Sequence, residues 1–285
     1  MSAAPELAFT PDRGDVHVDL DRLVAGRLLI VADSGGGKTR AIRSFAEQTH
    51  GRVQQFLVDT EGDFGTLRER FDYLFVSAGG EGDLPAIPEQ AGALCVRLLE
   101  LQVSAIFDLY DLDVEERQRY TRLLLEPLTG RALPRSLWRP LAVVIDELKD
   151  LAPEGGFGES EATKAVVDLN TKGRKRAFFL VGATQRISSV DKNAISGIAN
   201  KLIGLTTLDT DYARAGRMLG FQPRRYRELM ELSPGEFFAT GPAMSARGVT
   251  RVRTGDVLTT HIEPGRVAPP TPPAPEHIRA LLEQL

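Results

Sequence analysis

Residues 28–39 read LLIVADSGGGKT, and this stretch decides the fold of the chain. An apolar run leads into a turn with three consecutive glycines, and the helix-like sequence RAIRSFAEQ follows directly. Glycines allow backbone N–H groups to turn inward around phosphate oxygens, and the first turn of a helix adds the positive end of its dipole. A surface turn with an incidental lysine would lack these flanks. The stretch therefore predicts a strand, a phosphate-binding loop and a helix in succession.

Within this loop, Lys38 would neutralise the β- and γ-phosphates of a nucleotide, and the Thr39 hydroxyl would bind Mg²⁺. The usual pattern G-x-x-x-x-G-K-[ST] begins with glycine, whereas Ala32 stands at that position here. Alanine is small and the inner glycines form most of the cradle, so the departure is mild. The residues expected to bind the nucleotide are Ser34, Gly35, Gly36, Gly37, Lys38, Thr39 and Arg40.

Residues 141–147, LAVVIDE, form a second apolar run that ends in two acids. Asp146 would hold Mg²⁺, directly or through water, and Glu147 would orient or deprotonate the attacking water. An Asp-Glu pair also commonly opens a solvated loop. The functional interpretation is favoured because a phosphate loop is present in the same chain.

Two more apolar runs end in polar residues. Asp59, Glu61 and Asp63 crowd the turn after one of them, and Thr184 and Gln185 follow the other. Open parallel sheets bind ligands outside the carboxyl ends of their strands. Gln185 could therefore reach the γ-phosphate or the attacking water. Position alone does not assign it that task, because such residues are more often helix caps or turn residues.

Short apolar runs alternate with helical stretches over most of the chain. Apolar and polar residues do not alternate within the runs, which is typical of strands covered on both faces by helices. Strand, helix and strand in such repetition predict an α/β fold with a doubly wound, mostly parallel sheet. The predicted strands are 28–32, 56–59, 73–76, 104–109, 141–146 and 178–183.

The clearest helix is predicted over 114–126, with Asp113 as its N-cap and Pro127 at its end. No internal repeat stands out, and no second set of core-forming elements follows. One large domain is therefore expected over residues 1–262.

The end of the chain has a different pattern. Residues 235–240, 249–253 and 257–261 read as short strands between Gly-containing turns, and they predict an antiparallel edge on the sheet. A proline-rich stretch, 263–275, follows as an extended linker. Residues 276–285 predict an amphipathic helix, because apolar residues recur at i, i+3, i+4 and i+7.

Composition limits the class of protein. The 285 residues include 35 basic and 39 acidic side chains, for a net charge of −4, and a single cysteine, Cys95. One cysteine excludes an internal disulfide framework and a zinc site built from several thiolates. The net charge argues against a dedicated nucleic-acid coat, although not against a local basic stripe. Neither a membrane-spanning run nor a signal peptide is visible, so we expect a cytoplasmic globular protein without a membrane partner.

Five landmarks in one order resemble the HerA/FtsK superfamily of P-loop ATPases, and the chain looks closest to the HerA-like branch. Each motif alone is weak, but their order and spacing reinforce one another. The likeness covers residues 16–240, which is the ATPase core without the N-terminal barrel of HerA-like helicases. The landmarks are ADSGGGKT (32–39), DTEGDF (59–64), SAIFDL (104–109), VVIDELKDLAP (143–153) and KGRKRAFFLVGATQR (172–186).

The resemblance implies a RecA-like fold and a homohexameric ring with ATP bound between neighbouring subunits. Gln185 would then sense the γ-phosphate, and an arginine from the adjacent subunit would stabilise the transferred phosphoryl group. The basic segment 172–176 also fits a solvated helix end. The resemblance assigns ATP and Mg²⁺ to Lys38, Thr39, Asp146 and Glu147. It offers Arg174 and Arg176 as the arginine in trans, with Arg186 as a third candidate.

Such rings move double-stranded DNA through a central pore, for example in packaging by a phage or a mobile element. A pore needs few cations per subunit, because six copies multiply them and phosphate contacts are non-specific. None of the candidate DNA contacts is decisive. They are the loops 153–161 and 187–195, with Lys192 and Asn193 in the second, and the cluster Arg224, Arg225 and Arg227.

A different class of function also fits the sequence: an ATP-dependent oligomeric scaffold or switch that acts on a protein partner. The minimal core, the weak DNA-contact signals and the tethered C-terminal helix favour it. That helix would capture a nuclease or another protein, or it would pack on its own or a neighbouring subunit. A monomeric nucleotide-dependent transferase is a third alternative.

Overall fold

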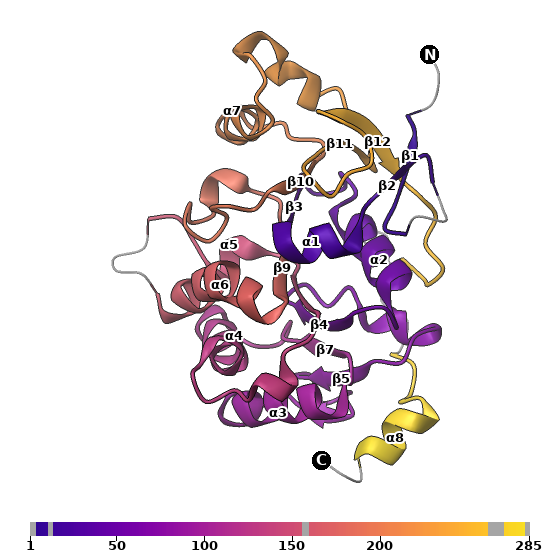
Figure 1. Cartoon of the computed structure of the whole chain (residues 1–285), viewed down its shortest axis with the longest axis vertical. Coiled ribbons are helices and arrows are strands. Elements are labelled where there is room, and N and C mark those ends of the chain that lie inside the picture. Colours follow the sequence, from indigo (N-terminus) through magenta and orange to yellow (C-terminus); the bar gives the residue numbers. More distant parts are fainter. Residues whose placement is uncertain (1–3, 11–13, 156–159, 262–270, 283–285) are drawn as a thin grey trace.

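The computed structural model describes residues 4–10, 14–155, 160–261 and 271–282. In this part of the chain the strands form one mixed sheet of twelve, and helices lie on both of its faces (Figure 1). The helices of the two faces enclose separate hydrophobic cores.

The centre of the sheet is parallel and contains all six strands predicted from the apolar runs. Parallel strands end at the same edge of a sheet, so the residues that follow them meet there. The prediction of a doubly wound, mostly parallel α/β fold is confirmed. In spatial order these strands are β3 (Leu28–Val31), β9 (Phe178–Thr184), β8 (Leu141–Ile145), β4 (Gln54–Asp59), β7 (Ala105–Asp108) and β5 (Leu74–Ser77), with the short β6 (Leu84–Pro85) outside β5.

The other side of the sheet is mixed. β10 (Asn200–Ile203) pairs in parallel with β3, and β11 (Glu236–Thr240) and β12 (Thr250–Thr254) continue as antiparallel strands. The antiparallel edge predicted from the C-terminal sequence is thereby confirmed for two of its three strands. β1 (Glu6–Ala8) and β2 (Val16–His17) complete this side. The sequence pattern did not predict β1, β2 or β10, because two to four residues carry too little periodicity.

The predicted strand at 257–261 is wrong. This segment lies against helix α2 (Lys38–Thr49) and joins no sheet. The N–H groups of Leu258 and Thr259 donate to the carboxylate of Glu47 at 2.6 and 3.0 Å. Because a side chain satisfies these backbone donors, the segment needs no neighbouring strand.

Alternate residues of each central strand face opposite cores. Leu28 and Ile30 of β3 pack in the core formed with α2 and α1 (Leu20–Gly26), whereas Leu29 and Val31 belong to the larger core on the other face. This burial on both faces explains why the apolar runs lack alternation. The helices of the larger core are α3 (Pro88–Leu101), α4 (Val114–Thr129), α5 (Leu148–Leu151), α6 (Glu161–Lys172) and α7 (Asp209–Met218).

Helix α4 begins where it was predicted and ends later. The Asp113 side chain accepts a hydrogen bond from the N–H three residues on, at 2.8 Å, as expected for an N-cap. Pro127 does not stop the helix but lies inside its last turn. A proline there removes a single internal donor, and the Gly130 N–H still closes the turn on the Glu126 carbonyl at 2.9 Å.

Helix α8 (Glu276–Leu282) packs on the rest of the chain. Ile278 is 1% exposed and, with Ala274, belongs to the larger core. The helix lies within the predicted stretch 276–285, while residues 263–270 of the predicted linker fall outside the described residues. None of the helices in the described ranges combines the length and apolarity needed to cross a membrane.

Candidate nucleotide-binding site

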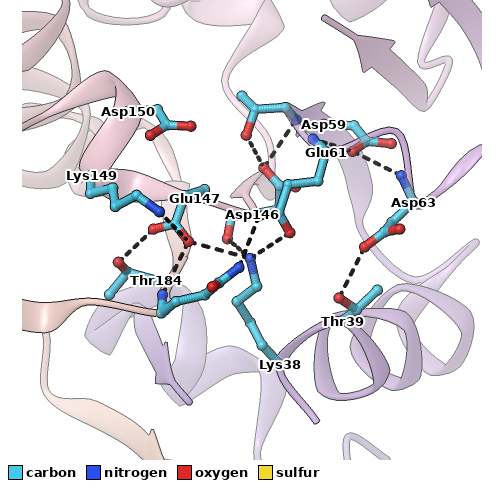
Figure 2. A network of polar contacts seen from close by, with 12 residues as sticks. Lys38, Thr39, Asp59, Glu61, Asp63, Asp146, Glu147, Lys149, Asp150 and Thr184 are labelled. Atoms are coloured by element: carbon cyan, nitrogen blue, oxygen red, sulfur yellow. Dashed lines mark hydrogen bonds and ion pairs between the residues drawn. The ribbon is translucent and has the colours of Figure 1, made fainter. Parts of the chain in front are cut away.

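A pocket of about 900 Å³ opens at the carboxyl edge of the sheet, where β3 runs into α2. Acids from the turn after β4, Gln185 after β9 and residues flanking β11 complete its wall. Its size suits a nucleotide. Figure 2 shows Lys38 at the centre of acidic side chains from several strand ends. Of the predicted nucleotide-binding residues, this wall contains Ser34, Gly35, Gly37, Lys38, Thr39 and Arg40.

The phosphate loop needs its glycines. Gly35 and Gly37 have φ angles of 73° and 100°, in the left-handed region that side chains disfavour. A Cβ on Gly37 would lie 2.7 Å from the nitrogen of Gly235, because the turn before β11 passes directly against the loop. Gly36 accepts a hydrogen bond from the same Gly235 N–H at 3.0 Å. Gly37 is also the N-cap of α2 and offers no side-chain acceptor, which leaves the first N–H groups of the helix to a ligand.

Lys38 is almost fully buried and is surrounded by acidic groups. Its ammonium lies 3.1 Å from Glu61 Oε2, 3.5 Å from Glu147 Oε2 and 2.9 Å from the carbonyl oxygen of Asp146 (Figure 2). Burial by itself lowers the pKa of Lys38, but the charges of Asp146, Glu147 and Glu61 outweigh it and raise the pKa above the usual value of a lysine. Lys38 is therefore a charged hydrogen-bond donor, and its surroundings fix it at the phosphate loop.

Asp146 is buried and leaves one oxygen unused. Its Oδ1 accepts hydrogen bonds from the Thr60 N–H and hydroxyl at 3.1 and 2.9 Å, whereas Oδ2 has no hydrogen-bond partner. Burial raises the pKa of Asp146 to about 6, against the attraction of Lys38. The Thr39 hydroxyl faces the same pocket and donates to Asp63 at 3.1 Å.

Thr39 and Asp146 are residues of the kind that bind a magnesium ion. An orphaned carboxylate oxygen in a buried place is the group that a cation or its bound water would satisfy. Across the described ranges, no cluster of three or more acids, histidines or cysteines is arranged as an all-protein metal site. Mg²⁺ commonly binds through one or two protein groups, with phosphates and water as its other ligands. Thr39 and Asp146 are suited to that mode of binding.

Glu147 is fully buried, and both of its oxygens are engaged. The Thr184 hydroxyl donates to Oε1 at 2.6 Å, and the Gln185 N–H donates to Oε2 at 3.1 Å. The ammonium of Lys149 lies 3.6 Å from Oε2 (Figure 2). The last residue of β9 and the residue after it thus hold the Glu147 carboxylate beside Lys38, behind the pocket wall.

Asp59 organises the turn after β4. Its carboxylate accepts hydrogen bonds from the N–H groups of all four residues 61–64, at 2.7 to 3.3 Å. Burial and the charge of nearby Asp146 raise the pKa of Asp59, while these four donors favour its charged form. The turn thereby presents Glu61 and Asp63 to the pocket.

Glu61 joins two of the predicted site residues. Its Oε2 accepts from Lys38, and its Oε1 accepts from the side-chain amide of Gln185 at 2.9 Å. Gln185 is thus brought to the pocket, where its predicted task as a sensor stays a prediction. Glu61 was not among the predicted site residues. The signal that could have found it is the row of acids in 59–64 at the end of a predicted strand.

Arg40 lines the pocket, but its guanidinium is held by the C-terminal part of the chain. Its Nη2 lies 2.7 Å from Asp256 Oδ1, and its Nε donates to the carbonyl of Gly255 at 3.2 Å. Contact with a nucleotide would require Arg40 to leave these partners.

Two predicted trans arginines, Arg174 and Arg176, lie in the 3₁₀ turn η3 (Gly173–Arg176), just before β9. This is the edge of the sheet opposite the phosphate loop. Arg176 donates to the Leu128 carbonyl at 2.8 Å and stacks 5.1 Å from the Trp138 ring, whereas Arg174 is exposed. The structure therefore places neither arginine at the pocket of its own chain.

Arg186, the third candidate, follows Gln185 and is committed to helix α7. Its Nε donates to the buried carboxylate of Asp211 at 2.8 Å, and the Ser188 N–H donates to the same carboxylate at 2.7 Å. The turn that carries Gln185 is thereby fastened to α7.

The candidate DNA contacts are partly on the surface. Residues 156–159 of the first loop lie outside the described residues. Lys192 and Asn193 are exposed after β9, and the three arginines of the 3₁₀ turn η5 (Pro223–Leu229) are exposed as well. Arg225 is paired with Glu228 at 2.7 Å, which leaves the other two as the more available cations.

Fold and site together define a P-loop nucleotide-binding protein: a phosphate loop after one parallel strand and an acidic pair after another. The family model described as the central domain of helicase HerA matches residues 8–211. The match spans most of the chain, which belongs to this HerA central-domain family and thus to the HerA/FtsK type of P-loop ATPases, as the motifs predicted.

Solved structures share the fold at low sequence identity. The genome-packaging NTPase B204 of Sulfolobus turreted icosahedral virus 2, in complex with ATP-γ-S, is 10% identical over 80% of this chain and 96% of that one, with a TM-score of 0.51. The bacterial conjugative coupling protein TrwB is 12% identical over 88% of this chain and 89% of that one, with a TM-score of 0.60. VirB4 of Thermoanaerobacter pseudethanolicus is 10% identical over 80% of this chain and 89% of that one, with a TM-score of 0.58. No curated protein matches the chain.

Proposed function

We propose that the protein hydrolyses ATP and uses the reaction to move double-stranded DNA, as a subunit of a homohexameric ring in the cytoplasm. The observation that carries the proposal is the pocket at the phosphate loop, which Lys38 and Thr39 line. The carbonyl oxygen of Asp146 lies 2.9 Å from the Lys38 ammonium, and Oδ2 of the same residue has no hydrogen-bond partner. The names of the related structures, a genome-packaging NTPase and a conjugative coupling protein, support DNA as the cargo.

The residues of the pocket divide the chemistry among them. Lys38 and the free N–H groups of the loop would bind the phosphates. Mg²⁺, held by Thr39 and Asp146, would neutralise charge on the β- and γ-phosphates. Glu147 lies 3.5 Å from the Lys38 ammonium, and it would orient the attacking water once that ammonium is bound to the phosphates.

A head-to-tail ring would complete the site. In the ring that we propose, the edge of one subunit that carries Arg174 would meet the pocket edge of the next, because a head-to-tail interface joins two different surfaces. Arg174 is exposed, whereas Arg176 is used within its own chain. Arg174 is therefore our candidate for the residue that stabilises the transferred phosphoryl group in trans.

The surface of α7 and η5 is our candidate for DNA contact. Arg217, Arg224 and Arg227 are exposed there, and the described part of the chain places no carboxylate within ion-pair distance of them. Asp211 ties α7 to the turn of Gln185. A movement of Gln185 on binding the γ-phosphate would therefore reach this basic surface through Asp211, which is hydrogen-bonded to Arg186 and Ser188.

Two substitutions test the ATPase assignment. Lys38→Ala removes the ammonium that would bind the phosphates, and it should abolish ATP binding and hydrolysis. Glu147→Gln should retain ATP binding but lower kcat by about 10² to 10⁴. ATP turnover and nucleotide titration measure both effects, with the exposed Glu81→Gln as a control for the same change of charge. Full activity in the Lys38→Ala variant would contradict the proposal.

Particle mass and DNA response test the motor. A hexamer should form with Mg²⁺, a non-hydrolysable ATP analogue and duplex DNA, and duplex DNA should stimulate ATP turnover at low salt. Replacing Arg217, Arg224 and Arg227 with alanine should reduce the stimulation and its salt dependence. ATP hydrolysis without any binding of DNA or response to it would exclude the motor and favour the protein-directed scaffold.

A further inference from the structure

Glu61 occupies a place that the proposed roles of its neighbours do not explain. Its carboxylate accepts hydrogen bonds from the Lys38 ammonium at 3.1 Å and from the Gln185 amide at 2.9 Å. The side chain is 33% exposed and forms part of the pocket wall. A negative charge therefore lies beside the lysine that phosphate oxygens would approach.

The turn after β4 does not need this carboxylate for its own structure. Asp59 already satisfies the N–H groups of residues 61–64. The hydrogen bonds of the Glu61 side chain go to Lys38 and Gln185, which belong to other elements of the site. Its charge consequently acts on the pocket rather than on the fold.

The same charge competes with a nucleotide. A γ-phosphate and Glu61 cannot both lie next to Lys38 without strong repulsion between them. Of the acids around Lys38, Glu147 has a side chain that is 1% exposed, and Asp146 is equally buried. Glu61 lines the pocket, so it is the acid that can turn away toward solvent when a phosphate arrives.

We propose that Glu61 is a positioning residue, which holds Lys38 and Gln185 in place as long as no triphosphate is bound. The γ-phosphate of ATP then displaces Glu61 from Lys38. Displacement frees the Gln185 amide for the γ-phosphate. ADP has no γ-phosphate, so it brings less negative charge to Lys38 and does not compete with Glu61 for the Gln185 amide. The inference rests on the proposed ATPase function of this pocket, and it makes Glu61 the residue by which the pocket distinguishes ATP from ADP.

Glu61→Gln tests this inference, because it keeps the size of the side chain and removes its charge. With Mg²⁺, the dissociation constant for the ATP analogue AMPPCP should fall about tenfold, and that for ADP should fall less than about twofold. The KM for ATP should fall in proportion, while kcat should not rise. Glu61→Ala should shift the preference in the same direction, and thermal unfolding checks that both variants are folded.

Glu81→Gln, with the same change of charge outside the pocket, should leave both dissociation constants as they are. An unchanged ratio of ADP to AMPPCP affinity in both Glu61 variants, with normal binding by the unaltered protein, would overturn the role of Glu61 and leave the ATPase assignment intact. Failure of the unaltered protein to bind either nucleotide would overturn both.

Discussion

At the scale of single residues, the site is a set of acids whose surroundings give them different tasks. Asp59 faces four backbone donors, Glu147 faces a hydroxyl, a backbone N–H and two lysines, and Asp146 keeps one oxygen unused. Glu61 alone among these four lines the pocket. Charge removal should therefore act on folding at Asp59 and on ligand binding at Glu61.

Asp59→Asn should lower the free energy of unfolding by about 2 kcal/mol. The amide keeps one acceptor oxygen, and its NH₂ group would face backbone donors that then lack an acceptor. A denaturant titration measures the effect, with Asp21→Asn on the exposed surface of α1 as the matched control. Equal stability of the two variants would show that Asp59 does not hold the turn.

At the scale of elements, residues 255–261 form a C-terminal strap over helix α2. Glu47 accepts two N–H groups and the Thr259 hydroxyl of the strap, and Arg43 donates to the same hydroxyl at 2.6 Å. The first turn of α2 carries Lys38, and the last residue of the strap, His261, lines the pocket. The strap therefore leads from β12, the last of the described strands, to the candidate nucleotide pocket.

Glu47→Ala should free the strap and cost about 3 kcal/mol, because it leaves buried donors without an acceptor. The amides of Leu258 and Thr259 should then exchange with solvent much faster, while those of β8 keep their protection. Glu100→Ala on the exposed face of α3 is the control. Unchanged exchange at both amides would mean that Glu47 does not secure the strap.

At the scale of the whole molecule, the two edges of the sheet have different tasks. The carboxyl edge holds the candidate nucleotide pocket. At the amino edge, Ile278 of α8 lies beside Val53, Val103 and Pro140, which precede β4, β7 and β8. The C-terminal helix thus packs on its own chain, as one of the sequence-based alternatives had it.

Ile278→Ala should weaken the docking of α8 by about 2 to 4 kcal/mol and leave the sheet intact. Limited proteolysis should then cut residues 276–282 sooner, and ATP binding should not change. Glu276→Ala, on the exposed side of the same helix, tests whether a change in helix propensity alone would speed the cleavage. Equal cleavage of both variants would contradict the docking role of Ile278.

By itself the sequence determined the class of protein and indicated the local parts of the candidate site. The loop at 28–39 and the acids at 146–147 lie within a few residues of a strand end, so composition and order suffice to predict them. Burial of the central strands on both faces leaves the same local trace, an apolar run without alternation.

Only the tertiary structure decided which strand ends meet. Glu61 reaches Lys38 across 23 residues and Gln185 across 124, because β4 and β9 flank β8 in the sheet. The strap bonds to Glu47 across more than 200 residues, in place of the predicted strand. A sequence pattern indicates strands one at a time, whereas their order in space depends on packing between distant segments, and that order places Glu61 between the lysine and the glutamine.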